Sequence, residues 1–120
     1  SGTFRALQLA AAAAYDNDDA WHEVHNYEVY AQRRHYAEQI MDLLHCEYDP
    51  NQVGMFLWGR IPDHYDTVET LTERLLHEAR VFITPGFIFG SNGNRYIRIS
   101  LCTTKEKFQE ALRRINTLNL

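Results

Sequence analysis

Residues 96–101 read YIRISL, and this alternation of apolar and polar residues decides the fold. Alternating side chains point to opposite faces of a strand, so the apolar residues are expected to pack under helices. They are Ile97, Ile99 and Leu101. The opposite face carries Tyr96, Arg98 and Ser100. The pattern therefore presents Arg98 from a rigid strand rather than from a flexible loop.

Arg98 is the candidate binding residue. Its planar guanidinium offers paired donors that match a carboxylate in a two-bond geometry, which suits an acid substrate. The alternative is an arginine on a solvated face that pairs with a glutamate. The alternation alone leaves both interpretations open.

Two more strands flank this segment in the sequence. Residues 54–58 read GMFLW, a short run of bulky apolar residues that indicates a buried strand, closed by Pro62. Residues 81–84 read VFIT and predict another short strand. Residues 85–94 then contain three glycines and are expected to form a loop.

Helical patterns surround these strands. Apolar residues at spacings of three and four, together with capping signals, predict four helices. The predicted helices cover Thr3–Tyr15, Asp19 or Ala20 to Tyr48, a segment from Asp66 (with Glu69) to Ala79, and a last one from Thr103 (with Glu106) to Ile115. The fold class is then α/β: a small mixed or antiparallel three-stranded sheet packed against helices, with a long N-terminal helix.

Composition narrows the functional classes. The chain has 120 residues, a net charge of −4 and no basic stripe, so neither nucleic acid nor a membrane is an expected partner. Cys46 and Cys102 lack metal or redox spacing, which favours a reduced, cytoplasmic setting. The start at Ser1 indicates a chain entered midway, with no leader. The apolar segment Leu7–Ala14 predicts self-association of the isolated piece.

The loop at residues 84–94 reads TPGFIFGSNGN. Its glycine spacing resembles a phosphate-binding loop, but a strand follows it where such a loop needs a helix, so a phosphate site is not expected. Ordinary turn packing is one interpretation of its apolar residues Phe87, Ile88 and Phe89.

Other reactive residue types do not form a recognisable site. His22 and His25 lie three apart on a predicted helix, but no third metal ligand accompanies them, so no metal site is expected. His35, His45, His64 and His77 are assigned to the surface or to helix packing. Arg33-Arg34 is expected to be a half-buried and half-solvated pair on the long helix rather than a binding patch. No Ser-His-Asp or Cys-His arrangement is apparent.

Several of these segments together resemble the C-terminal domain of class I/II aminotransferases, pyridoxal-phosphate enzymes of the aspartate aminotransferase type (fold type I). The similar segments are GMFLW at 54–58, ARVFITPG at 79–86, FG at 89–90, YIRIS at 96–100 and the closing helix at 103–115. The opening SGTF, with Gln8 and the alanines, resembles the helix of the large domain that precedes this small domain.

The resemblance implies a domain division and a role for Arg98. It also implies a mobile flap near the substrate entrance that carries Phe87, Ile88 and Phe89, which stays open beside ordinary turn packing. Residues 1–18 would be a residual helix of the large cofactor-binding domain, and residues 19–120 the small domain. Arg98 would bind the α-carboxylate of an amino acid that exchanges its amino group with a 2-oxo acid. The full-length protein would be a homodimer, with its cofactor held as a Schiff base on a lysine.

The chain itself is expected to be inactive. Its only lysines, Lys105 and Lys107, fall in the first turn of the last helix, where a desolvated nucleophile is not expected. No catalytic, cofactor-binding or metal residue is assigned, and the fragment is not expected to bind pyridoxal 5'-phosphate. Two alternatives remain open: a domain of a pyridoxal-phosphate lyase or decarboxylase with the same fold, or a non-catalytic binding or oligomerisation module.

Overall fold

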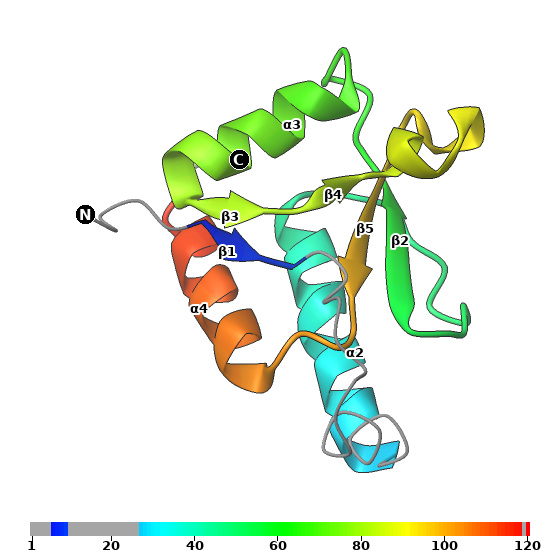
Figure 1. Cartoon of the computed structure of the whole chain (residues 1–120). Coiled ribbons are helices and arrows are strands. Elements are labelled where there is room, and N and C mark those ends of the chain that lie inside the picture. The colour runs from blue at the N-terminus through cyan, green and yellow to red at the C-terminus, as the bar shows by residue number, and fades with distance from the viewer. Residues whose placement is uncertain (1–5, 10–26, 119) are drawn as a thin grey trace.

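The computed structural model describes residues 6–9, 27–118 and 120, and these residues form two sheets (Figure 1). The larger sheet is antiparallel with strand order β2-β5-β4, and the smaller is a parallel pair of β1 and β3. The strands are β1 Leu7–Gln8, β2 Phe56–Arg60, β3 Val81–Phe82, β4 Thr84–Pro85 and β5 Tyr96–Ser100. The predicted α/β fold with a small three-stranded sheet is confirmed.

Helices cover the apolar face of the larger sheet. They are α2 Tyr27–Leu43, α3 Val68–Arg74 with its π-helical extension Leu75–Ala79, and α4 Lys105–Asn116. Helices α2 and α4 lie side by side (Figure 1), and the ring of Tyr36 stacks on that of Phe108 at a centroid distance of 6.1 Å. None of the helices in the described part of the chain is long and apolar enough to span a bilayer.

The alternation in β5 is borne out by burial. Ile97 and Ile99 are fully buried in the core, whereas Arg98 between them is half-buried on the other face. Helix α2 packs closely against β2. A Cβ atom added to Gly59 on β2 would lie only 2.4 Å from the sulfur of Met41 on α2. This contact leaves no room for a side chain at position 59, so glycine allows the helix to approach the sheet.

The helix predicted over Thr3–Tyr15 is wrong for its described part, residues 6–9. Leu7 and Leu9 donate backbone hydrogen bonds to the carbonyl oxygens of Arg80 and Phe82, both at 2.9 Å, so this segment is extended. Leu9 is fully buried, and the apolar contact that it gains favours the strand over the local helix preference. The prediction that the apolar segment Leu7–Ala14 is exposed is therefore also wrong at Leu9. Residues 3–5 and 10–15 lie outside the described residues.

The long helix ends earlier than predicted. Helix α2 stops at Leu43 rather than Tyr48, because His45 adopts a left-handed conformation with a φ of 59°. The amide of Cys46 then donates to the carbonyl of Met41 at 2.9 Å, which closes the helix end. Glu47 continues as an isolated bridge to Arg60. The predicted start of this helix, before residue 27, lies outside the described residues.

Both predicted helix caps are one residue too early. The side chain of Thr67, not Asp66, accepts a hydrogen bond from the amide of Thr70 at the start of α3. At the start of α4, Thr104 rather than Thr103 accepts from the amide of Lys107. In each case the capping residue has an extended backbone and lies three positions before the amide that it binds. Several neighbouring polar residues could have capped the helix in the same way.

The strand predicted over residues 81–84 is divided between the two sheets. Val81–Phe82 pairs with β1, and Thr84–Pro85 pairs with β5. Ile83 lies between the two pairs and is fully buried. The chain therefore changes sheets at one residue, and this change brings Thr84 beside the central strand β5.

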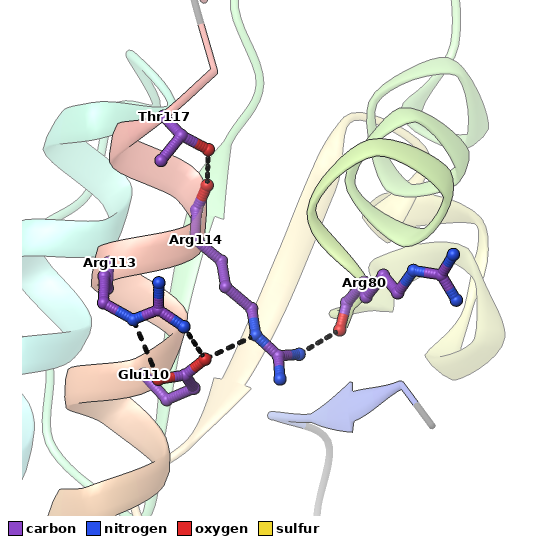
Figure 2. A network of polar contacts seen from close by, with 5 residues as sticks. All are labelled: Arg80, Glu110, Arg113, Arg114 and Thr117. Carbon is purple, nitrogen blue, oxygen red and sulfur yellow. Dashed lines mark hydrogen bonds and ion pairs between the residues drawn. The ribbon is translucent and has the colours of Figure 1, made fainter. Parts of the chain in front are cut away.

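A polar network joins the end of α4 to the turn before β3 (Figure 2). Glu110 accepts hydrogen bonds from Arg113 and from Arg114, the latter at 2.8 Å from Nε. Arg114 also donates from Nη1 to the carbonyl of Arg80 at 3.0 Å. Arg80 has a φ of 55°, so the network stabilises a left-handed turn that directs the chain into β3.

Candidate functional site

Arg98 lies at the centre of a row across the larger sheet. Its register partners are Trp58 on β2 and Thr84 on β4. Directly opposed residues in antiparallel strands share a face, so the three side chains project from the face that the core helices do not cover. The sequence predicted this face for Arg98, and the structure adds its two neighbours.

Aromatic rings surround the guanidinium of Arg98. Its Cζ atom lies 3.6 Å from the ring centroid of Phe89 and 4.0 Å from that of Phe56. The ring of Trp58 is 5.8 Å away and meets Phe89 edge to face. The negative faces of the rings attract the cation and hold its long side chain in place, which is the pre-organisation that a planar carboxylate receptor requires.

Arg98 has no anionic partner among the described residues. Its Nε atom is buried without a hydrogen-bond partner in this part of the chain. Burial lowers the pKa of Arg98, and no described carboxylate opposes that shift. The guanidinium nevertheless remains charged, because arginine stays protonated in proteins. The alternative interpretation, a solvated arginine paired with glutamate, does not describe this side chain.

Arg95 provides a contrast within the same segment. Its guanidinium donates to the carbonyl oxygens of Tyr65 at 2.7 Å, Asp66 at 3.1 Å and Pro62 at 2.8 Å. These bonds tie the turn before α3 to the start of β5. Arg95 is therefore structural, whereas Arg98 retains donors that protein atoms in the described residues do not use.

The loop after β4 places Phe89 over Arg98. It consists of two short 3₁₀ turns, Gly86–Phe89 and Ser91–Gly93. The turns meet at Gly86 and Gly93, where a Cβ atom on Gly93 would lie 2.2 Å from the carbonyl oxygen of Gly86. The close approach of the two glycines therefore closes the loop. Phe87, Ile88 and Phe89 are 39%, 58% and 48% exposed.

A hollow of about 320 Å³ is bordered by two of the aromatic rings that contact Arg98. Its lining residues are Trp58, Gly86, Phe89, Asn92, Gly93 and Tyr96. Trp58 and Phe89 thus border both the hollow and the guanidinium. The loop at 86–93 and the strand residues Trp58 and Tyr96 form this hollow, and the rings of Trp58 and Phe89 connect it to Arg98.

The other candidates remain apart from this site. Lys105 and Lys107 are exposed in the first turn of α4, so the described residues contain no lysine suited to carry a carbonyl cofactor. No group of three or more potential metal ligands occurs in the described ranges. His22 and His25 lie outside those ranges. The four histidines within them are exposed, namely His35, His45, His64 and His77.

Arg33 is more buried than the half-buried and half-solvated pair predicted from the sequence. Arg33 is 6% exposed and Arg34 is half-buried, with its Nη2 donating to the carbonyl of Gly54 at 3.1 Å. Cys46 and Cys102 are not joined in a disulfide. None of these residues contributes to the face that carries Arg98.

Sequence reasoning missed the partners of Arg98. Phe56 and Trp58 are two residues apart on β2, and this spacing could have placed them on one face. It could not have predicted the register that sets Trp58 opposite Arg98. Phe89 was considered only as part of the loop, either as a flap near the substrate entrance or as turn packing, and no periodic pattern related it to Arg98. Thr84 was assigned to a strand, and only the pairing of β4 with β5 brings it to the arginine.

The chain belongs to the class I and II aminotransferase family, whose sequence profile matches residues 2–115. It is 34% identical over 120 residues to transaminase BacF from Bacillus subtilis, covering 99% of this chain and 30% of BacF. It is 34% identical over 119 residues to an LL-diaminopimelate aminotransferase from Oleidesulfovibrio alaskensis, covering 98% of the chain and 30% of that enzyme.

Comparison with solved structures gives the same family as comparison of the sequences. The apo form of BacF from B. subtilis superposes with a TM-score of 0.68 at 32% identity, covering 85% of this chain and 26% of BacF. The chain therefore spans about 30% of the length of the relatives that it matches. The fold class and the family inferred from the sequence are both confirmed.

Proposed function

We propose that this chain is the small domain of an aminotransferase and that Arg98 binds the α-carboxylate of its amino acid and 2-oxo acid substrates. One observation carries this proposal: a charged guanidinium has an unused buried donor and is held by aromatic rings, two of which line a hollow. A carboxylate matches both its charge and its planar donor geometry. Family membership supports the type of reaction.

The chain's own contribution is to bind and orient the substrate. Arg98 would hold the carboxylate at a defined point, and the apolar walls formed by Trp58 and Phe89 would reduce competition from water. The cofactor, pyridoxal 5'-phosphate, supplies an electron sink for the reaction when bound. Because both lysines are exposed on α4, the residues that hold this cofactor are proposed to lie in the rest of the protein.

The proposed domain division keeps residues 19–120 as the small domain and residues 1–18 as part of a larger one. The burial of Leu9 and its backbone bond to Ser100, at 2.9 Å, support a modified boundary in which residues 6–9 pack with the small domain. Family membership also supports a homodimer built on the larger domain, which sedimentation of the whole protein would test. Cys46 and Cys102 are not joined in a disulfide, which supports the proposal of a reducing, cytoplasmic location.

Substituting Arg98→Met in the whole protein tests the proposed function. The specificity constant for an amino acid such as L-alanine should fall by about 10² to 10⁴, since two hydrogen bonds to a charged group are lost. The constant for ethylamine, which lacks the carboxylate, should change little. Arg60→Met is a matched control, because Arg60 lies on the same strand as Trp58 but bonds to Asp63. Equal losses for both substrates in Arg98→Met would contradict the proposal.

The rival reactions are separated by their products. A transaminase converts the amino acid to a 2-oxo acid with the same carbon skeleton, whereas a lyase or decarboxylase breaks a carbon bond. Chromatography of the products from isotopically labelled L-alanine would distinguish these outcomes. A binding or oligomerisation module would give no product in the whole protein.

A further inference from the structure

Thr84 lies beside Arg98 and shares an unusual property with it. The two residues are register partners across β4 and β5, and Thr84 is only 6% exposed. The hydroxyl oxygen of Thr84 and the Nε atom of Arg98 are both buried, and both lack a hydrogen-bond partner among the described residues. Two unsatisfied polar atoms thus occur at adjacent positions on one sheet face.

This arrangement is unfavourable for the chain alone. A buried hydroxyl without a partner loses its hydrogen bonds to water and gains none in return. Valine would fill the same space in a strand without that cost. The hydroxyl and the guanidinium also do not bond to each other, although directly opposed side chains have Cβ atoms about 5 Å apart. A third group with acceptor atoms would satisfy both residues.

The chemistry of the two atoms defines that group. The Nε–H of Arg98 can only donate, and the hydroxyl of Thr84 can donate by rotating about its Cβ–Oγ1 bond. An acceptor with two oxygen atoms in one plane, a carboxylate, can receive a bond from each. Pro85 follows Thr84, with a φ of −71°, and its ring restrains the backbone at this end of β4.

We propose that Thr84 is a second carboxylate-binding residue, whose hydroxyl donates to the same substrate carboxylate that Arg98 binds. This inference rests on the proposed function of Arg98. It places the carboxylate beside Arg98 and Thr84, on the sheet face that also carries Trp58. The carboxylate then has one charged and one neutral donor, both presented by paired strands.

Propionate is a suitable probe, because it has a carboxylate but no amino group and cannot react. Its dissociation constant would be measured on the whole protein by calorimetry, and its effect on the melting temperature by thermal denaturation. Thr84→Val, which keeps the shape but removes the hydroxyl, should weaken propionate binding about tenfold. Without ligand, this variant should melt at the same temperature as the wild type or higher. Thr84→Ser should bind within about threefold of the wild type.

The outcomes separate this inference from the proposed function. If Thr84→Val binds propionate as tightly as the wild type while Arg98→Met does not bind it, the role of Thr84 is overturned and that of Arg98 stands. If Arg98→Met also binds normally, the proposed function fails as well. Should Thr84→Val not fold, Thr84→Ser and Thr84→Ala form a second pair. Equal affinities in that pair would overturn the inference, and a tenfold difference would support it.

Discussion

The ring of Phe89 lies over the guanidinium of Arg98, with 3.6 Å between the ring centroid and Cζ. Phe89 belongs to the loop after β4, and Arg98 to the central strand β5. The contact therefore joins an exposed apolar loop segment to a half-buried cation. A movement of the loop would uncover the face of the guanidinium, so the position of Phe89 affects access to the proposed carboxylate site.

Replacing Phe89 with leucine should release the guanidinium. The loss of a partly desolvated cation–π contact should lower the free energy of unfolding by about 1–2 kcal/mol. The side-chain protons of Arg98 should also lose the upfield ring-current shift of a stacked group in the NMR spectrum. Phe87→Leu, in the same 3₁₀ turn, is the control and should leave the Arg98 signals in place. Unchanged Arg98 signals in Phe89→Leu would show that the stack does not form in solution.

Gly93 should not tolerate a side chain. Its added Cβ atom would approach the carbonyl oxygen of Gly86 to 2.2 Å, so the backbone of the loop must move. We expect Gly93→Ala to lower the free energy of unfolding by about 1–3 kcal/mol, as overpacking does, and to displace Phe89 from Arg98. Denaturant unfolding and the same NMR signals would measure both effects. Ser91→Ala, at an exposed position of this loop, should change neither.

The ion pairs of Glu110 should make stability depend on acid pH. Hydrogen bonds from Arg113 and Arg114 lower the pKa of Glu110 from 4.5 to about 2. A carboxyl group with a depressed pKa in the folded state stabilises the fold above its unfolded pKa. That contribution is lost as the pH falls from about 4.5 towards 2.

Urea unfolding of Glu110→Gln at several pH values checks this expectation. The variant should be less stable than the wild type at pH 7, and the difference should shrink as the pH falls below about 4.5. Glu73→Gln, at an exposed position on α3, serves as the control and should not show this narrowing. A difference that is constant from neutral to acid pH would mean that the ion pairs do not stabilise the fold.

The two cysteines should react at very different rates. Burial raises the pKa of Cys46 to about 12, whereas Cys102 is half-buried. The thiolate is the reactive form, so at pH 8 Cys46 should be labelled only when the core opens. A thiol reagent that absorbs light on reaction would report one fast and one slow phase. Cys102→Ala should remove the fast phase. Loss of the fast phase in Cys46→Ala instead would contradict the burial of Cys46.

Local pattern predicted most elements but not their ends. The apolar spacing in α2 identifies a helix, yet its end depends on His45 adopting a left-handed conformation and on Glu47 pairing with Arg60. Likewise, polar residues around the starts of α3 and α4 indicate a cap without selecting which one. Helix ends are decided by a few competing hydrogen bonds, whose energies differ too little for spacing to separate them.

Tertiary contacts overrode local preference at the start of the chain. Leu7 and Leu9 lie in a segment of good helix formers, but in the structure their amides bond to Arg80 and Phe82. Helix propensities differ by less than about 1 kcal/mol per residue, and burial of a leucine contributes more than that. A partner strand more than 70 residues away in sequence is invisible to any local pattern.

By itself, the sequence determined the α/β class, the family and the face of β5 that carries Arg98. The last of these follows from the pleat of a strand, in which each side chain is placed by its immediate neighbours. Only the tertiary structure brought Phe89, Trp58 and Thr84 to that arginine. Those contacts depend on strand register and on the closure of the loop at Gly86 and Gly93, which join residues that no local period relates.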